Sequence, residues 1–438
     1  MELSAFETFL VAACDLNGCM RGKRVSGDYA AKLNQGAVRM PISALSLDIF
    51  GADVAASPLV FASGDSDGVM RPTERGPVPL PWLETRQAIV PMTMYEENGS
   101  PFAGDPRCAL LAVLDRYAAR DWKVIAATEL EFTLVDDGHQ ELAPVRNPET
   151  GRPLQAEEIL SITELDVFDA FLSDIYSGAK AMGIRAQTAT SESGIGQFEI
   201  TLTHQDALRA ADDTWLFKHL IRRTARKHGF AATFMAKPFA DDAGNGMHVH
   251  FSVLDADGAN IFDDGSAKGT ETLRYAINGC LNAMRDCTLL FAPHSGSYDR
   301  LVPGAHAPTG VAWAYENRTA AIRVPGGAPA ARRIEHRVAG GDTNPYLVFA
   351  AVLGAAINGI ENATLAPDPI TGNAYDLSLE QLAPDWSTAV DIFKTSSEVA
   401  GIFPKQLIEN LVLAKLQEMD RLRDVPKAQH WKTYLETV

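Results

Sequence analysis

The segment at 122–136, WKVIAATELEFTLVD, constrains the fold more than any other part of the chain. Its β-branched and aromatic residues predict a long strand. A helix-like run at 105–121 precedes it, with Asp105 suited to cap that helix and Pro106 at its first position. We expect further strands at 186–190, 196–202, 246–254 and 320–325, and further helices at 165–182, 210–228, 270–287 and 344–358. Because strands and helices do not alternate strictly, the sequence predicts an α+β fold.

Residues 1 to about 100 predict a small mixed domain. We expect an amphipathic helix in MELSAFETFLVAACDLNG, two short strands around an Asn-Gly turn in CDLNGCMRGKRV, and a second helix in GDYAAKLNQG that ends at Gly36. The stretch at 57–81 is rich in Gly and Pro, which excludes a long regular element there. A chain of 438 residues is too long for one core, so we expect two domains, at 1–103 and 104–438.

Composition excludes several classes of protein. The net charge of −17 argues against a nucleic-acid surface, which needs clustered Lys and Arg. No apolar run is long enough to cross a membrane, and no basic region precedes the first apolar run as in a signal peptide. Five cysteines are an odd number and make no disulfide framework. Together these features favour a cytoplasmic protein that binds neither nucleic acid nor membrane.

Carboxylates and histidines occur where strands should be apolar. In TELEF, Glu129 and Glu131 are two apart on one strand, so both side chains point to the same face. SESGIGQFEI adds Glu192 and Glu199, and GNGMHVHF adds His248 and His250, again on one face. Carboxylates that gather on one face repel each other unless a cation or proton lies between them. Ligation by oxygen favours Mg²⁺ or Mn²⁺, whereas a histidine pair alone would favour zinc, and solvated strand faces are the alternative to a site.

Arginines concentrate in RLVPGAHAPTGVAWAYENRTAAIRVPGGAPAARRIEHRVAG. They are Arg300, Arg318, Arg323, Arg332, Arg333 and Arg337. Planar guanidinium groups suit bidentate contacts with phosphate and carboxylate. Beside a carboxylate cluster they indicate ATP phosphates and an acidic substrate bridged by metal, although structural ion pairs are the alternative. The chain lacks the GxxxxGK[ST] pattern, so no P-loop would hold the nucleotide.

These motifs, in this order, resemble the glutamine synthetase superfamily from RGKRV to TNPYL, and within it the γ-glutamylpolyamine and γ-glutamylalkylamide synthetases. The resemblance implies a small N-terminal β-grasp domain and a large catalytic domain with a curved antiparallel sheet. It implies that members form rings of six, often stacked to twelve. It also implies two or three Mg²⁺ or Mn²⁺ ions at each site and ATP as a co-substrate.

The resemblance implies a role for each matching residue. One metal would be held by Glu131, Glu192 and Glu199, and a second by Glu129, His248 and Glu335. His250 would contact ATP, and the phosphates would be stabilised by Arg318, Arg323 and Arg333. Glutamate would lie among Arg300, Arg337 and Gly244, next to Glu131 and His248. The implied reaction converts the γ-carboxylate of glutamate to an acyl phosphate, which an amine then attacks.

Three departures from the ammonia-using members bear on the amine. His306 stands where those members have a glutamate that helps deprotonate ammonium, Asp48 is the only residue left of their Asp-Gly-Ser-Ser run, and Ala243 replaces an asparagine. Losing a carboxylate should weaken ammonium binding and make room for a substituent, which favours an organic primary amine. His306 would act as a base or merely fill space. Tyr375 stands where some bacterial members are adenylylated, although packing is the simpler role.

Other interpretations remain open from the sequence. The chain could be an ammonia-using glutamine synthetase, a ligase for another carboxylic acid, or a catalytically silent ring protein on the same scaffold. The six predicted metal ligands argue against the silent protein, since a scaffold without catalysis need not keep a costly carboxylate cluster.

Overall fold

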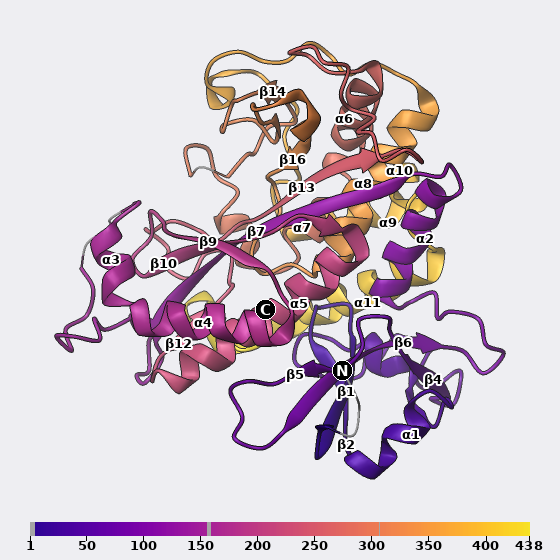
Figure 1. The fold of residues 1–438 in the computed structure, drawn as a ribbon, viewed down its shortest axis with the longest axis vertical. Helices are drawn as coiled ribbons and strands as arrows, with labels where there is room; N and C mark the ends of the chain where they lie inside the picture. The colour runs from indigo at the N-terminus through magenta and orange to yellow at the C-terminus, as the bar shows by residue number, and fades with distance from the viewer. Residues whose placement is uncertain (1–4, 156–158, 306) are drawn as a thin grey trace.

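The computed structural model describes residues 5–155, 159–305 and 307–438, and it contains two sheets (Figure 1). The smaller sheet has the strand order β2-β1-β6-β4-β3, with β5 beside β6. Its strands are β1 (Thr8–Cys14), β2 (Met20–Ser26), β3 (Val38–Pro41), β4 (Asp67–Pro72), β5 (Val78–Pro79) and β6 (Gln87–Tyr95). A short helix, α1 (Ala30–Leu33), follows β2 and precedes the turn at Gly36.

The predicted N-terminal helix is wrong, because its apolar run forms strand β1. This strand pairs antiparallel with β2 and parallel with β6. Alternate side chains enter two different cores: Phe9 and Val11 pack in the small core, while Ala12 and Cys14 pack in the large one. A strand that buries both of its faces has a near-continuous apolar run in place of an alternation of apolar and polar residues.

The predicted hairpin around the Asn-Gly turn is present between β1 and β2. Gly18 has a φ of 84°, a conformation that favours glycine. The Asp15 carboxylate accepts hydrogen bonds from the backbone N–H groups of Asn17 and Cys19 at 2.9 Å each. The turn is therefore fixed by its own side chains.

The larger sheet has the strand order β14-β15-β16-β13-β7-β10-β9, and β8, β11 and β12 also pair with β7. All its pairings are antiparallel among the described residues except β14 with β15. Its strands are β7 (Lys123–Asp136), β8 (Ala143–Pro144), β9 (Ala186–Ser191), β10 (Gln197–Leu202), β11 (Gln205–Asp206), β12 (Ala231–Thr233), β13 (Met247–Leu254), β14 (Trp313–Tyr315), β15 (Ile322–Val324) and β16 (Ile334–His336). The predicted long strand is confirmed as β7, and β13 runs beside it (Figure 1).

The remaining helices pack against the strands of the larger sheet or against one another. They are α2 (Pro106–Ala118), α3 (Ile162–Val167), α4 (Asp169–Met182), α5 (Ala207–Lys227), α6 (Glu271–Met284), α7 (Thr288–Phe291), α8 (Pro345–Asn362), α9 (Trp386–Thr395), α10 (Ser397–Ala400), α11 (Lys405–Leu422) and α12 (Trp431–Tyr434). The predicted Asp105 cap is confirmed, because its side chain accepts from the backbone of Arg107 and Cys108. Helix α8 is apolar on nearly all sides, and α2 and α6 pack against it, which explains why it is almost wholly buried.

The two sheets share an apolar boundary. Strands β1 and β6 each send side chains into both the small and the large core, with Ile89 of β6 in the large core and Val90 in the small one. The mixed architecture and the mainly antiparallel large sheet agree with the α+β prediction. The five cysteines are free, and Cys280 and Cys287 are buried as small apolar residues. Within the described residues, none of the helices combines the length and apolarity needed to cross a membrane.

Candidate metal and substrate site

Strand register brings the predicted site residues into one row across the larger sheet. Glu199 of β10 lies opposite Glu131 of β7, and Glu129 of β7 lies opposite His248 of β13. The row continues because His250 of β13 lies opposite Glu335 of β16, and Glu335 lies opposite Arg323 of β15. Antiparallel neighbours point to the same face of a sheet. Segments that are far apart in the sequence therefore meet at one surface.

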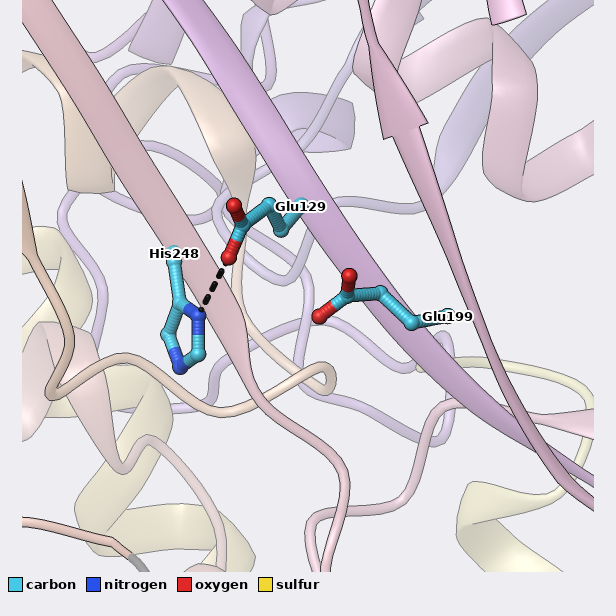
Figure 2. A group of neighbouring side chains, drawn as sticks. All are labelled: Glu129, Glu199 and His248. Atoms are coloured by element: carbon cyan, nitrogen blue, oxygen red, sulfur yellow. Dashed lines mark hydrogen bonds and ion pairs between the residues drawn. The ribbon is translucent and has the colours of Figure 1, made fainter. Parts of the chain in front are cut away.

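Glu129 is the centre of this row. Its Oε2 is 2.9 Å from Nδ1 of His248, and its Oε1 is 3.0 Å from Nε2 of His250. Figure 2 shows the carboxylate of Glu129 turned toward His248, with the carboxylate of Glu199 directed toward the same space. Ligand atoms of Glu129, Glu199 and His248 lie within 4.8 Å of one another, as do those of Glu129, His250 and Glu335.

Glu335 is fully buried and lies between two arginines. Nη1 of Arg323 donates to Oε2 of Glu335 at 2.8 Å, and Arg337 donates to Oε1. Just before β16, Nε of Arg333 donates to Nδ1 of His250 on the neighbouring strand β13 at 3.3 Å. The cationic groups thus border the carboxylate row at its β15–β16 end.

Glu131 and Arg300 meet at the glycine-rich loop before β13. The backbone N–H of Gly246 donates to Oε2 of Glu131 at 2.5 Å. A Cβ atom at Gly246 would lie 2.7 Å from Nη2 of Arg300, so a side chain at this position would displace the guanidinium. Nη1 of Arg300 donates to the carbonyl of Val338 at 2.7 Å. Arg300 itself is buried, and a Cβ atom at Gly244 would lie 3.0 Å from its Cγ.

Glu192 and Glu199, at the other end of the site, have raised pKa values. Burial, together with the negative charges of Glu129, Glu131 and Glu192, raises the pKa of Glu199 to about 9. Burial and the charge of Glu131 raise the pKa of Glu192 to about 7, although Arg318 opposes this rise. Such shifts are what carboxylates show when they face one another without a cation between them.

Glu129 and Glu335 behave differently. Burial disfavours their charged forms, but hydrogen bonds from His248 and His250 outweigh it for Glu129, and its pKa lies well below the usual range. For Glu335, burial is outweighed by the charges of the same histidines and of Arg337, so its pKa is also lowered.

The donor set fits a divalent cation. Two carboxylates with raised pKa values share a surface with two carboxylates that stay ionised, and histidine nitrogens lie between them. A divalent ion would relieve the repulsion, and oxygen-rich ligation suits Mg²⁺ or Mn²⁺. The close groups cut across the two predicted ligand sets, because Glu129 belongs to both and His250 joins one of them.

A cavity of about 820 Å³ opens beside the row. Glu129, His250 and Arg333 line it, together with backbone and small side chains of β7, β13 and the segment before Arg333. A cavity of this size that meets both carboxylate and guanidinium groups can admit a nucleotide-sized ligand.

Three predicted residues lie apart from the row or outside it. The Asp48 carboxylate is fully buried and accepts from Arg421 at 2.7 Å and from Gln417 at 2.8 Å, so it joins the N-terminal part to α11. His306 lies outside the described residues. The hydroxyl of Tyr375 donates to the carbonyl of Ala307 at 3.0 Å, a contact that suits packing.

Sequence reasoning assigned no role to Gln197, Asp242 and Asn245. Gln197 and Asn245 stand inside the motifs GQFE and GNGMHVH, and all three make hydrogen bonds between the segments that carry Glu192 and Gly244. Their position beside predicted site residues could have indicated this role, since polar residues next to metal ligands often hold those ligands in place.

A row of carboxylates and histidines on a mainly antiparallel sheet, bordered by arginines and a cavity, has the donor groups that a divalent cation needs. The family model described as "Glutamine synthetase, catalytic domain" matches residues 103–434, and the chain belongs to this family.

Similarity to individual proteins extends over most of the chain. It is 36% identical to the gamma-glutamylputrescine synthetase PuuA of Escherichia coli over 377 residues, covering 84% of this chain and 78% of that protein. It is 31% identical to a glutamate–isopropylamine ligase of a Pseudomonas species, covering 100% and 97%. A solved structure titled as a GmaS/ADP complex superposes with a TM-score of 0.85 at 28% identity, covering 99% and 97%.

Proposed function

We propose that this chain is an ATP-dependent ligase that joins the γ-carboxylate of glutamate to a primary amine. The observation that carries the proposal is the row from Glu199 through Glu131, Glu129 and His248 to Glu335, which lies within the residues that the family model matches. The names of the similar γ-glutamyl amine ligases support an organic amine as the acceptor.

In this proposal each end of the row has its own task. Glu131, Glu192 and Glu199 hold one divalent ion, and Glu129, His248 and Glu335 hold another, with His250 close enough to share in ligation. Bound ions of this kind neutralise phosphate charge during phosphoryl transfer. These two ions would be Mg²⁺ or Mn²⁺. A third ion of the same kind would enter together with the nucleotide.

The substrates then take the places that the charges favour. ATP occupies the cavity of about 820 Å³ near His250 and Arg333, and its phosphates reach toward Arg318 and Arg323. Glutamate lies near Gly244 and is held by Arg300 and Arg337. The loop before β13 supports this placement, because Arg300 lies against Gly244 and Gly246 there.

The reaction has two steps. An oxygen of the γ-carboxylate attacks the γ-phosphorus of ATP, the bond to the bridging oxygen breaks, and ADP leaves. The neutral amine nitrogen then attacks the acyl carbon, inorganic phosphate leaves with the bonding electrons, and the nitrogen loses a proton. Arginine guanidinium groups offset the negative charge that moves in both steps. His306 would receive the proton, since the Asp48 carboxylate is buried against Arg421 and Gln417.

We further propose that residues 1–103 are a β-grasp domain, that residues 104–438 are the catalytic domain with a curved sheet, and that copies assemble into hexameric rings or a dodecamer. The Asp48 carboxylate is buried against Arg421 within the single chain, so the proposed assembly rests on the resemblance to the family and not on this residue. The mass of the assembly in solution, measured by light scattering, tests this part of the proposal.

The experiment that tests the function is a screen for amide formation. The protein is incubated with ATP, Mg²⁺ and glutamate, and with ammonium, methylamine, ethanolamine, isopropylamine or putrescine in turn, and the products are identified by mass spectrometry. We expect an ADP-coupled γ-glutamyl amide with an organic amine at a higher kcat/KM than with ammonium. Highest kcat/KM for ammonium would instead make the chain a glutamine synthetase. Absence of any amide would reject the ligase.

A further inference from the structure

Two side chains join the turn that carries Glu192 to the loop that carries Gly244. The turn runs from Glu192 to Gln197 and closes on itself, because the N–H of Glu192 donates to the carbonyl of Gln197 at 2.9 Å. The loop runs from Asp242 to Asn245 and leads into β13. The backbone of the turn and the backbone of the loop do not pair as strands, so side chains connect the two segments.

Gln197 extends from the turn to the loop. Its Oε1 accepts from the backbone N–H of Gly194 at 2.9 Å, within its own turn. Its Nε2 donates to the carbonyl of Gly244 at 2.9 Å and to Oδ1 of Asn245 at 3.0 Å. The side chain is only 2% exposed, so these hydrogen bonds are shielded from water.

Asp242 extends in the opposite direction, from the loop to the turn. Its Oδ2 accepts from the backbone N–H of Ile195 at 2.9 Å, and its Oδ1 accepts from the N–H of Ala243 at 2.7 Å. A Cβ atom at Gly194 would lie 2.9 Å from Oε1 of Gln197 and 3.3 Å from Oδ1 of Asp242, so the turn fits closely between the two side chains.

We propose that this pair, the Gln197–Asp242 bridge, couples the acid-substrate pocket to the metal-ligand turn. Neither residue touches the reacting atoms, so both are positioning residues. Ordering the loop at Gly244 around the acid also orders the turn that presents Glu192, because each segment supplies backbone groups to the other's side chain. The inference rests on the proposed function, since it takes Gly244 and Glu192 to be the sites of glutamate and metal.

Asn245 anchors the bridge to the sheet. Its Oδ1 also accepts from the hydroxyl of Thr133 on β7 at 3.1 Å, and its Nδ2 donates to the carbonyl of Met235 at 2.9 Å. The loop therefore has a fixed reference on β7, the strand that carries Glu129 and Glu131. A shift of the loop would be transmitted to the turn and not absorbed elsewhere.

The test uses Gln197→Met, which keeps the length of the side chain and removes its donor and acceptor. We expect the KM for glutamate and the Mg²⁺ concentration for half-maximal activity to rise together by about ten-fold, the scale of one or two buried hydrogen bonds. The KM for ATP, which binds at the other end of the row, should stay within about two-fold, since well-separated sites respond independently.

Asp242→Asn is the second variant, because it keeps the shape of Asp242 and can satisfy only one of the two N–H groups. We expect the same pattern, and the double variant should be little worse than the poorer single one, since both act through one connection. The control is Gln87→Met on β6, whose Nε2 donates to Thr85 far from the row. It should leave all three constants unchanged.

A binding version separates this inference from the proposed function. The thermal shift caused by Mg²⁺ is measured with and without glutamate, in the absence of ATP and amine, for the unaltered protein and both variants. We expect glutamate to increase the Mg²⁺ shift in the unaltered protein and to do so less in the variants. If all KM values rise equally while the melting temperature falls, or if both variants keep the full effect of glutamate, the coupling is absent. Failure of the amine screen alone would reject the ligase and leave this coupling intact.

Discussion

Glu129 and His248 lie directly opposite one another on adjacent antiparallel strands, and Oε2 of Glu129 is 2.9 Å from Nδ1 of His248. This contact places a carboxylate that stays ionised at the middle of the row, within reach of both groups of close ligand atoms. On one side of Glu129 lie Glu131 and Glu199, the proposed ligands of the first ion. On the other side lie His248 and Glu335, which are proposed to hold the second ion. In the proposed assignment the pair belongs to the second metal site, next to the proposed first site of Glu131 and Glu199.

Glu129→Gln should abolish most of the activity. The amide keeps the size of the side chain but loses the negative charge of a ligand to the proposed second ion, so we expect kcat/KM to fall by about a hundred-fold or more. The stabilisation by Mg²⁺ in a thermal melt should decrease as well, because only the proposed first ion keeps its full set of ligands. Glu409→Gln on the exposed face of α11 serves as the matched control and should behave like the unaltered protein. Full Mg²⁺ stabilisation in the Glu129 variant would place the ions elsewhere.

The metal-free protein should lose stability as the pH rises. Glu192 and Glu199 have pKa values raised to about 7 and about 9, above those of the unfolded chain near 4.3. The folded state therefore binds more protons than the unfolded state between about pH 4.5 and pH 9, and linkage makes the free energy of unfolding decrease through that window. Melting temperatures measured in EDTA from pH 5.5 to pH 9 check this trend.

Added Mg²⁺ should reverse the trend, because the ion competes with protons for the same oxygens. The difference in melting temperature between Mg²⁺ and EDTA is expected to grow from pH 5.5 to pH 9. A difference that is constant across this range would mean that Glu192 and Glu199 do not titrate with the metal site.

Much of the site could be predicted from residue spacing. Glu129 and Glu131, and likewise His248 and His250, are two apart on strands, and a strand sends such residues to one face whatever lies beside it. Which residue lies opposite which could not be predicted in the same way. His248 lies opposite Glu129 only because of the register between β7 and β13. More than a hundred residues of chain separate these two strands, so their register cannot be predicted from local spacing.

The wrong helix at the N-terminus has a similar cause. The run that ends at Cys14 is apolar enough for either kind of element, and its pairing with β6, far along the chain, decides the outcome. The ion pairs of Glu335 with Arg323 and Arg337 could not be predicted from the sequence either. A sequence does not show whether an arginine binds a ligand or a neighbouring carboxylate.

Arg333→Gln tests the nucleotide end of the site. Its Nε donates to His250 at 3.3 Å, and it lines the cavity of about 820 Å³. Losing this cation should raise the KM for ATP by about ten-fold, the value of one charge-assisted hydrogen bond, and leave the KM for glutamate unchanged. Steady-state kinetics with each substrate varied in turn give both constants. Arg423→Gln, at an exposed ion pair with Asp420, is the control. A rise in the glutamate constant alone would exchange the two assignments.

Removing one partner of a buried ion pair in α11 should destabilise the whole chain. Nζ of Lys415 donates to Oε2 of Glu418 at 2.9 Å, both side chains are almost fully buried, and Oε1 of Glu418 accepts from Asn17 and from the backbone of Ile49. Glu418→Ala leaves Lys415 charged and unpaired in the interior, so we expect a loss of about 3–5 kcal/mol in the free energy of unfolding, measured by denaturant titration. Replacing Lys415 with Met in the same variant removes the stranded charge and should restore part of that loss. The exposed pair of Lys405 with Glu409 on the same helix provides the comparison, and Glu409→Ala should produce no measurable change. Equal effects of the two alanine variants would show that burial of the Lys415–Glu418 pair does not determine its contribution.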